Sequence, residues 1–469
     1  MKKPNLRIFV GKLVLLIIYL SSISLIFQSC QKVPENFAAS DKYRLVWNDD
    51  PAKTVTVAWD QHVDVNPVVY YDTQDHGRKF WKYKFTKTAD RVLDKYEMKN
   101  HFAKLADLQP DQVYYFVIKD DQGVSQRYWF RTAPDTPKPF TFIAGGDTKS
   151  SDEPLEAGRA SNRIVAKLRP LFVMFNGDFC SGNGTSPERW HLWLKDWQEL
   201  TTTSDMRMIP IFPVHGNHEN GDHANLNYIF NAPYQENDSS KIYYSASFGG
   251  DFFHIIALNS SVDPGGAQRD WLENDLKSHE DFTFKIAGYH KPMWPHTSSK
   301  RENPYQYNQW AHLFYDYGLN ISFDGDSHMS KITFPLRPDS TSNDSFMGYV
   351  RDDKNGTMFL GEGSWGAHPR KNDDDKPWTI QSFSGNQVKW IHVLPQEGQY
   401  PDRMKIYTIV SATYDENDKQ TLYDSQVETL TEENLFEIPE GVEFIENGPY
   451  GPVVYYPFSL NEEEKLAKN

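Results

Sequence analysis

The sequence has few cysteines and few basic residues relative to acidic ones. Only two of its 469 residues are cysteines, Cys30 and Cys180, so it is no disulfide-stapled small domain and must rely on a hydrophobic core. Lysine and arginine number 49 against 64 acidic residues, a net charge of -15. This deficit argues against a nucleic-acid-binding protein, which needs a basic face. The 39% hydrophobic and 14% aromatic content is typical of a folded protein, and the length fits two domains.

Residues 1–30 have the pattern of an export signal. An apolar run, Leu13 to Phe27, is interrupted only by serines and a tyrosine and is shorter than the roughly 20 residues of a spanning helix. It ends at Ser29-Cys30, which resembles the lipobox of bacterial lipoproteins. We therefore expect an exported protein anchored in a membrane through lipid on Cys30, which would leave no pair for an intrachain disulfide. The alternative is an uncleaved signal anchor. The basic residues that precede the run are Lys2, Lys3, Arg7 and Lys12.

A short tether, residues 31–40, leads into a region that predicts an all-β domain over 41–135. Short strand-like runs there are separated by turn signals, as in a β-sandwich. The order of Leu108, Pro110 and the strand beginning at Tyr114 resembles a fibronectin type III module. The predicted strands include Thr54 to Trp59, Val68 to Tyr71, Tyr114 to Ile118 and Tyr128 to Phe130.

The proline-rich segment from Ala133 to Pro139 reads as a linker, after which the pattern changes. Over 139–415, strand-like runs alternate with helical segments, which predicts an α/β layered domain. Trp190, Trp193 and Trp197 share one helix face and are expected in the core. Residues 416–469 are expected to form an extension that packs on this domain. The runs are Phe140 to Ala144, Leu171 to Phe175, Ile209 to Val214, Phe252 to Leu258, Phe284 to Ala287 and Leu319 to Phe323, and the helices Ser161 to Leu168, Glu188 to Leu200 and Gln268 to Ser278.

Five short motifs follow apolar runs and carry most of the chemical information. Because ligands bind beyond the carboxyl ends of strands in such sheets, we expect the motifs to converge on one site. Their Asp, Asn and His side chains supply enough donors for up to two metal ions, and carboxylate with imidazole suits iron, manganese or zinc. A glycine-rich turn, Gly361 to Trp365, is expected near the site or at a sheet edge. The motifs are Gly146-Asp147-Thr148, Asn176-Gly177-Asp178, Gly216-Asn217-His218-Glu219, Tyr289-His290 and Gly325-Asp326-Ser327-His328.

These donors favour metal-assisted hydrolysis of a phosphoester. Asp178 is the best candidate to bridge two ions, because it is central in the motif order, and Asn217 can donate its carbonyl oxygen. His218 neighbours a ligand without having to be one, so it is the natural acid for the leaving group. Taken singly, each motif has a structural explanation, since a Gly-Asp after a strand is often only a turn.

The ordered set resembles the calcineurin-like metallophosphoesterase superfamily, and the preceding module resembles that of the purple acid phosphatases. The resemblance covers roughly residues 43–410. It implies a four-layer α/β/β/α sandwich with two metals at its rim. It also implies that Asp147 and His328 bind the first metal, Asp178 bridges, and Asn217 and His290 bind the second.

Three positions depart from the family pattern. Lys149 and Ser181 stand where a histidine and a tyrosine are usual, which leaves the first metal short of ligands. Asp326 replaces a histidine and offers the second metal a carboxylate. Lys149 is a candidate to bind substrate phosphate, and the alternative is a lysine that simply points to solvent. His296 is a second candidate substrate contact or acid, near Trp294.

The leading prediction is thus an exported phosphatase that acts on small-molecule phosphomonoesters. Two alternatives stay open: a phosphodiesterase acting on nucleotides or lipid head groups, and a surface-tethered binding protein with a degenerate metal site. The missing ligands favour the binding protein, while the retained Asp178, Asn217, His218 and His290 speak against it.

Overall fold

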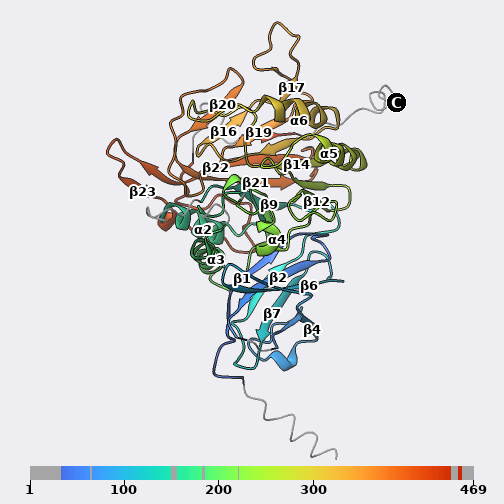
Figure 1. The fold of residues 1–469 in the computed structure, drawn as a ribbon, viewed down its shortest axis with the longest axis vertical. Coiled ribbons are helices and arrows are strands. Elements are labelled where there is room, and N and C mark those ends of the chain that lie inside the picture. The colour runs from blue at the N-terminus through green and yellow to red at the C-terminus, as the bar shows by residue number, and fades with distance from the viewer. Residues whose placement is uncertain are drawn as a thin grey trace, which may run out of the picture.

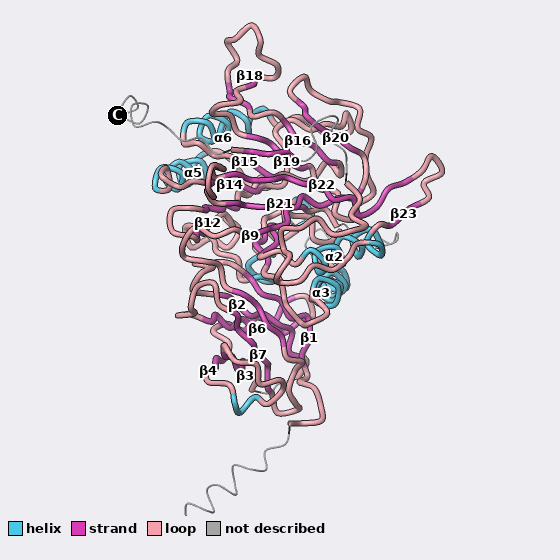
Figure 2. Tube along the Cα trace, turned by 180° about the vertical axis from the view of Figure 1, so that it is seen from behind, coloured by secondary structure: helices cyan, strands magenta, loops and turns pink. Residues whose placement is uncertain are grey.

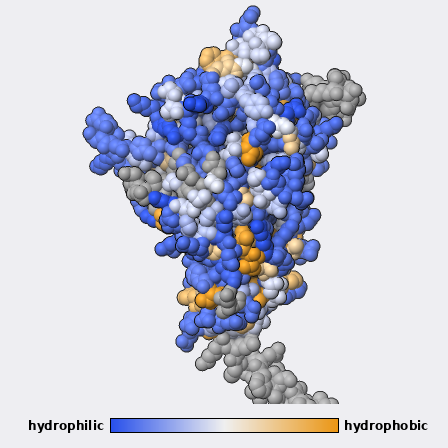
Figure 3. All heavy atoms as spheres, in the orientation of Figure 1, coloured by the Kyte–Doolittle hydropathy of each residue, from blue (hydrophilic) through white to orange (hydrophobic). Residues whose placement is uncertain are grey.

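A computed structural model describes residues 33–63, 66–148, 156–181, 185–219, 221–444 and 453–456 (Figure 1). The predicted leader with Cys30, the first two residues of the tether and Lys149 lie outside the described residues. Among the helices of the described ranges, none has the length and apolar character needed to cross a bilayer. The face drawn in Figure 3 is mainly hydrophilic, with small apolar patches.

The N-terminal region is all β. One of its two sheets has the order β4-β3-β7-β8, and the other side is formed by β1, β2, β6 and β5. Buried side chains of both, among them Val57, Phe116 and Phe130, belong to one core. The all-β domain is therefore present as predicted. Its elements are β1 (Ser40–Val46), β2 (Val55–Gln61), β3 (Val68–Asp72), η1 (Phe80–Lys82), β4 (Phe85–Thr88), β5 (Arg91–Lys95), β6 (Met98–Leu105), β7 (Val113–Lys119) and β8 (Tyr128–Arg131).

An 11-stranded sheet runs from this region into the rest of the molecule, in the order β23-β22-β21-β9-β10-β11-β1-β2-β6-β5, with β24 on β22. Its central strands β9, β10 and β11 are parallel, and β1 joins β11 in parallel at the pair Val46 and Ile211. The two regions thus share a sheet, which the linker signal did not indicate. The further elements are β9 (Phe140–Gly145), β10 (Phe172–Phe175), β11 (Ile211–Pro213), β21 (Asn386–Leu394), β22 (Arg403–Tyr414), β23 (Gln420–Leu422), η3 (Asp424–Gln426) and β24 (Val453–Tyr455).

A second, seven-stranded sheet has the order β12-β13-β14-β15-β19-β16-β20. Strands β13, β14, β15 and β19 run parallel within it. A small hairpin of β17 and β18 stands apart. The strands are β12 (Tyr244–Phe248), β13 (Phe253–Ala257), β14 (Phe284–Gly288), β15 (Ile321–Phe323), β16 (Ser330–Thr333), β17 (Leu336–Pro338), β18 (Tyr349–Arg351), β19 (Met358–Gly361) and β20 (Thr379–Phe383).

The two sheets pack face to face with helices outside, which confirms the predicted layers (Figure 2). Phe142 of β9 contacts both Phe253 of β13 and Phe323 of β15, with ring centroids 5.8 and 5.9 Å apart. On the outer side, Phe175 packs on the predicted tryptophan face of α3, whose three rings are buried. Helices α5 and α6 share a core with β13, β14 and β19. The helical elements are α2 (Glu156–Leu168), α3 (Pro187–Thr201), η2 (Asn217–Glu219), α4 (Asn225–Phe230), α5 (Gly266–Ser278) and α6 (Pro304–Asp316).

The described part of the C-terminal region adds to the large sheet. Strands β23 and β24 both pair antiparallel with β22. Between them Val427 and Leu430 enter the main core, and the Lys167 ammonium of α2 donates hydrogen bonds to the Asp424 and Val427 carbonyl oxygens.

Candidate active site

The five motifs lie at the carboxyl ends of β9, β10, β11, β14 and β15. The first three strands belong to the large sheet and the other two to the facing sheet. Since the strands are parallel within each sheet, their carboxyl ends share an edge, and the motifs of both sheets meet there. The side-chain contacts below show that the expected ligand residues converge.

Four of the expected ligand residues have a left-handed backbone. The φ angles of Asp147, Asp178, Asp326 and His328 are 64°, 54°, 65° and 54°. Non-glycine residues adopt this conformation at a cost, and such residues cluster at functional sites. Hydrogen bonds hold the conformation in place: the Asp326 N–H donates to both carboxylate oxygens of Asp147, at 3.1 and 3.0 Å.

The imidazole of His290 lies at the centre of the site and is fully buried. Its Nδ1–H donates to the Asn176 carbonyl oxygen at 2.7 Å, which directs Nε2 toward the other donors. Around Nε2 lie four oxygens: Asn217 Oδ1 at 3.1 Å, Asp178 Oδ1 at 3.2 Å, Asp326 Oδ1 at 3.7 Å and Asp147 Oδ1 at 4.0 Å. Ligand atoms that share one ion of this class lie about 3–3.5 Å apart. Asn217 Oδ1 and Asp178 Oδ1 lie within this range of Nε2, and small shifts of Asp326 and Asp147 would complete a metal site.

The charged side chains of the site shift one another's pKa values. Burial alone would lower the pKa of His290, but Asp178 and Asp147 outweigh it and raise the pKa to about 10. Burial would likewise raise the pKa of Asp326, yet His290 and Lys300 hold it below its ordinary value. Three buried carboxylates thus gather around cations, the electrostatic environment of a metal centre.

His328 approaches the same cluster from the other side of Asp147. Its Nδ1–H donates to the His368 carbonyl oxygen at 3.2 Å, and Nε2 lies 3.4 Å from Asp147 Oδ1. Asp147, Asp178 and His290 also present donor atoms that all lie within 4.8 Å of one another. The donors are thus arranged in two overlapping sets, one with His290 and one with His328.

His218 stands at the rim. Its backbone N–H donates to Asp178 Oδ1 at 2.8 Å, and its ring Nε2 lies 3.7 Å from Asp178 Oδ2. The side chain is 23% exposed, whereas those of Asp178 and His290 are fully buried. An imidazole next to the ligands but open to solvent is placed to exchange a proton with a bound molecule.

Glu219, the last residue of the third motif, is buried and holds two loops together. Its Oε2 accepts the N–H groups of Asp178 and Gly216, and Oε1 accepts that of Phe179, all at 2.9 Å. It therefore ties the loop after β10 to the loop after β11. Burial, and next the charge of Asp178, raise its pKa to about 8.

The position of His296 contradicts the suggested substrate contact. The ring is fully buried, with Nδ1 2.9 Å from Glu362 Oε1 and Nε2 2.7 Å from Thr379 Oγ1. Both nitrogens are therefore engaged inside the protein. The sequence showed only the proximity of His296 to His290, and its partners Glu362 and Thr379 come from segments more than sixty residues away.

The glycine-rich turn lies against the site and not at a sheet edge. A Cβ on Gly363 would stand 1.9 Å from Asp147 Oδ2. One on Gly325 would stand 2.6 Å from the same oxygen, and one on Gly216 2.6 Å from Asp178 Oδ1. Three glycines thus leave room for the carboxylates. Glu362, between the turn's glycines, contacts the ammonium of Lys331 at 2.9 Å, which also donates to Asp324 Oδ2 at 2.8 Å.

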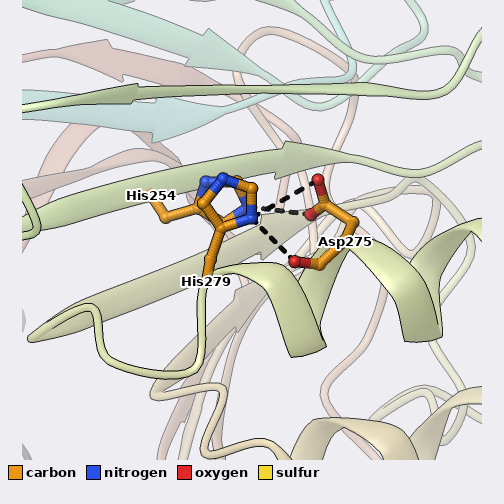
Figure 4. Close-up of side chains that lie close together, drawn as sticks. All are labelled: His254, Asp275 and His279. Carbon is orange, nitrogen blue, oxygen red and sulfur yellow. Dashed lines mark hydrogen bonds and ion pairs between the residues drawn. The ribbon is translucent and has the colours of Figure 1, made fainter.

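Two further groups of potential ligands lie elsewhere in the described residues. In one, the rings of His254 and His279 stack beside Asp275 (Figure 4), with centroids 3.8 Å apart and planes inclined by 16°. A metal lies near the plane of each imidazole that binds it, so two stacked, almost parallel rings cannot both bind one ion well. The other group contains Asp41 and Asp60, and the Lys42 ammonium already contacts both, at 2.7 and 2.9 Å.

Sequence reasoning missed Lys300 and Arg370. Lys300, in the segment between β14 and α6, forms an ion pair with Asp326 Oδ1. Arg370, after β19, donates from Nη1 to the Asp326 carbonyl oxygen at 2.7 Å. Neither stands in a motif, so no local signal marked them.

Comparisons with known proteins agree with this geometry. Residues 40–132 match the model of the purple acid phosphatase N-terminal domain, and residues 128–330 match that of the calcineurin-like phosphoesterases. Purple acid phosphatase 15 of Arabidopsis thaliana is 26% identical over 268 residues, 49% of this chain and 48% of the relative. A probable purple acid phosphatase 20 of the same plant is 28% identical over 237 residues, 47% of this chain and 52% of the relative. The matches thus span about half the length of these curated relatives.

A solved purple acid phosphatase from yellow lupin (Lupinus luteus) seeds has the same fold. It aligns with a TM-score of 0.64 and 16% identity, over 80% of this chain and 72% of that chain. The predicted motif order, the layered fold and both domain matches point the same way. The chain therefore belongs to the calcineurin-like metallophosphoesterase superfamily, in the purple acid phosphatase-like branch that carries the N-terminal β domain.

Proposed function

We propose that the protein is an exported, metal-dependent phosphatase that hydrolyses small-molecule phosphomonoesters. The observation that carries this proposal is the position of His290 Nε2, which faces three carboxylates and an amide oxygen within 4.0 Å. The names of the matched relatives support the same activity. Asn217, His290 and Asp326 would hold one ion, Asp147 and His328 the other, and Asp178 would bridge them. Iron, manganese or zinc suits this mixture of carboxylate and imidazole.

Bound ions would supply Lewis-acid stabilisation of the phosphoryl oxygens and make the attacking water more acidic. The chain's own residues supply the rest. His218, at the rim, gives a proton to the ester oxygen as the phosphorus–oxygen bond breaks, while the water oxygen forms the new bond to phosphorus. Lys149, which follows the described Thr148, remains a candidate contact to the phosphate.

The test uses the chelator-treated, full-length protein in detergent, reloaded separately with Fe, Mn or Zn. Metal content is measured by elemental analysis, and hydrolysis with p-nitrophenyl phosphate and bis(p-nitrophenyl) phosphate. We expect turnover of the monoester. With an alkyl phosphate, whose poor leaving group needs a proton, turnover should fall by about 10²–10⁴-fold in His218→Asn with metal content retained. A preference for the diester would replace the monoester proposal. No turnover of either by any metal-loaded form would favour a binding protein.

Export and the lipid anchor form the second part of the proposal, and the basic, apolar and Ser29-Cys30 segments of the sequence support it. The expected result is incorporation of labelled fatty acid and recovery in the membrane fraction, both lost in Cys30→Ser. An unlabelled protein in which Cys30→Ser leaves the fractionation unchanged would contradict the anchor.

A further inference from the structure

Lys300 occupies an unexpected position at the metal-binding cluster. Its ammonium forms an ion pair with Asp326 Oδ1, and its side chain is 22% exposed. The same oxygen lies 3.7 Å from His290 Nε2. The lysine therefore contacts the very atom that Asp326 would offer to an ion beside His290.

The segment that carries Lys300 is fixed at several points. The Lys300 N–H donates to the Thr297 carbonyl oxygen at 3.2 Å. Near the segment's end, Asn303 donates from its side chain to the Pro292 carbonyl oxygen at 2.6 Å and from its backbone to Met293 at 2.9 Å. Because these bonds order the backbone of the segment, only the rotamer entropy of the Lys300 side chain opposes its contact with Asp326.

Asp326 itself has little freedom to move away from the lysine. Its N–H is bound to the Asp147 carboxylate and its carbonyl oxygen to Arg370. A cation beside His290 must therefore share Oδ1 with the ammonium or displace it. Like charges so close repel in a partly buried site, where the effective dielectric is well below that of water.

The same chain shows that a lysine can fill a cation position between carboxylates. The ammonium of Lys42 lies between Asp41 and Asp60, a pair that with His62 has the spacing of a metal site. Asp147, Asp178 and Asp326 carry three negative charges when ionised, so one divalent ion together with Lys300 neutralises them.

We propose that Lys300 competes with metal for Asp326, so that the ion beside His290 is held weakly and exchangeably. This inference rests on the proposed function only in taking the cluster to be a metal centre. It assigns Lys300 a role in controlling metal occupancy. The departure of Asp326 from the family's histidine gives that control its chemical basis, because a carboxylate forms an ion pair with an ammonium whereas a neutral imidazole carries no charge to attract it.

The test is isothermal titration of the chelator-treated full-length protein with Mn²⁺ or Zn²⁺, which reads affinity and not activity. Lys300→Met should bind the ion beside His290 about tenfold more tightly than the unmodified protein, and Lys300→Arg should bind it with little change. The matched control is Lys241→Met, which removes an exposed lysine paired with Glu236 and should change nothing.

A double-mutant cycle with Asp326→Asn separates competition from a general effect on the fold. In the Asp326→Asn background, Lys300→Met should no longer tighten binding. Unchanged or weaker binding by Lys300→Met, or equal tightening in both backgrounds, would overturn the inference while leaving the metal centre intact. If neither the unmodified protein nor Lys300→Met binds metal, the proposed function fails as well. Lys300→Gln provides a second variant if Lys300→Met does not fold.

Discussion

Metal binding should release a proton from His290. In the metal-free protein the surrounding carboxylates raise the pKa of His290 to about 10, so at pH 7 the ring is almost fully protonated. Its Nδ1–H is committed to the Asn176 carbonyl oxygen, which means that the proton on Nε2 must leave before that nitrogen can bind a metal. The apparent affinity should therefore rise about tenfold per pH unit, or about 100-fold between pH 6 and pH 8.

The assay is isothermal titration at pH 7 in buffers with different ionisation enthalpies, which gives the number of protons released. We expect at least one. A further proton, up to one per chain, should come from Glu219, because an ion beside Asp178 weakens the repulsion that helps to hold its pKa near 8. His290→Gln should release about one proton fewer and bind with a flatter pH dependence. His312→Gln, which alters an exposed histidine of α6 outside the site, is the control.

The same pKa shift makes a prediction for stability. A histidine whose folded-state pKa exceeds its unfolded value stabilises the fold fully below pH 6.5 and loses that contribution as the pH rises toward 10. The metal-free protein should lose about 1.4 kcal/mol of unfolding free energy per pH unit across this window through His290, whereas the metal-loaded protein should not.

Release of no proton on metal binding, with a metal affinity independent of pH, would refute the reasoning about His290.

Three other changes test the framework of the site. Glu219→Gln leaves a buried N–H unsatisfied and should lower the free energy of unfolding by about 2–4 kcal/mol in urea titrations, whereas the exposed control Glu433→Gln should be neutral. Gly363→Ala places a Cβ against Asp147 at a φ of 84° and should reduce metal content in elemental analysis. Unaltered metal content would argue against the need for a glycine beside the Asp147 carboxylate. Phe142→Ala removes a ring between the sheets and should cost about 3–5 kcal/mol by chemical denaturation, with a much smaller loss contradicting the face-to-face core.

The order of elements in the catalytic region could be predicted because apolar runs and polar punctuation are local properties of the chain. Each of the six predicted strand runs overlaps an observed strand, and the three predicted helices correspond to α2, α3 and α5. The buried tryptophan face of α3 followed from helical spacing alone. The convergence of the five motifs followed from one rule, that the carboxyl ends of neighbouring parallel strands meet at an edge.

Other features depend on contacts between distant segments, and no local pattern encodes them. The sequence could identify Asp178 and His290 as donors, but their 3.2 Å separation exists only because two sheets pack face to face. Likewise His296 lay near a motif and was read as a substrate contact, although its partners Glu362 and Thr379 are more than sixty residues away in the sequence.

The sequence by itself determined the kind of chemistry, because the side chains that bind metal and move protons are fixed by residue type and by their positions after strands. Tertiary structure decided the state of those groups. The pKa of His290, the two loops held together by Glu219 and the pairing of Lys300 with Asp326 all arise from burial and from charges brought close by folding. Electrostatic energy depends on distance in space and on exclusion of water, and neither quantity can be deduced from the order of residues alone.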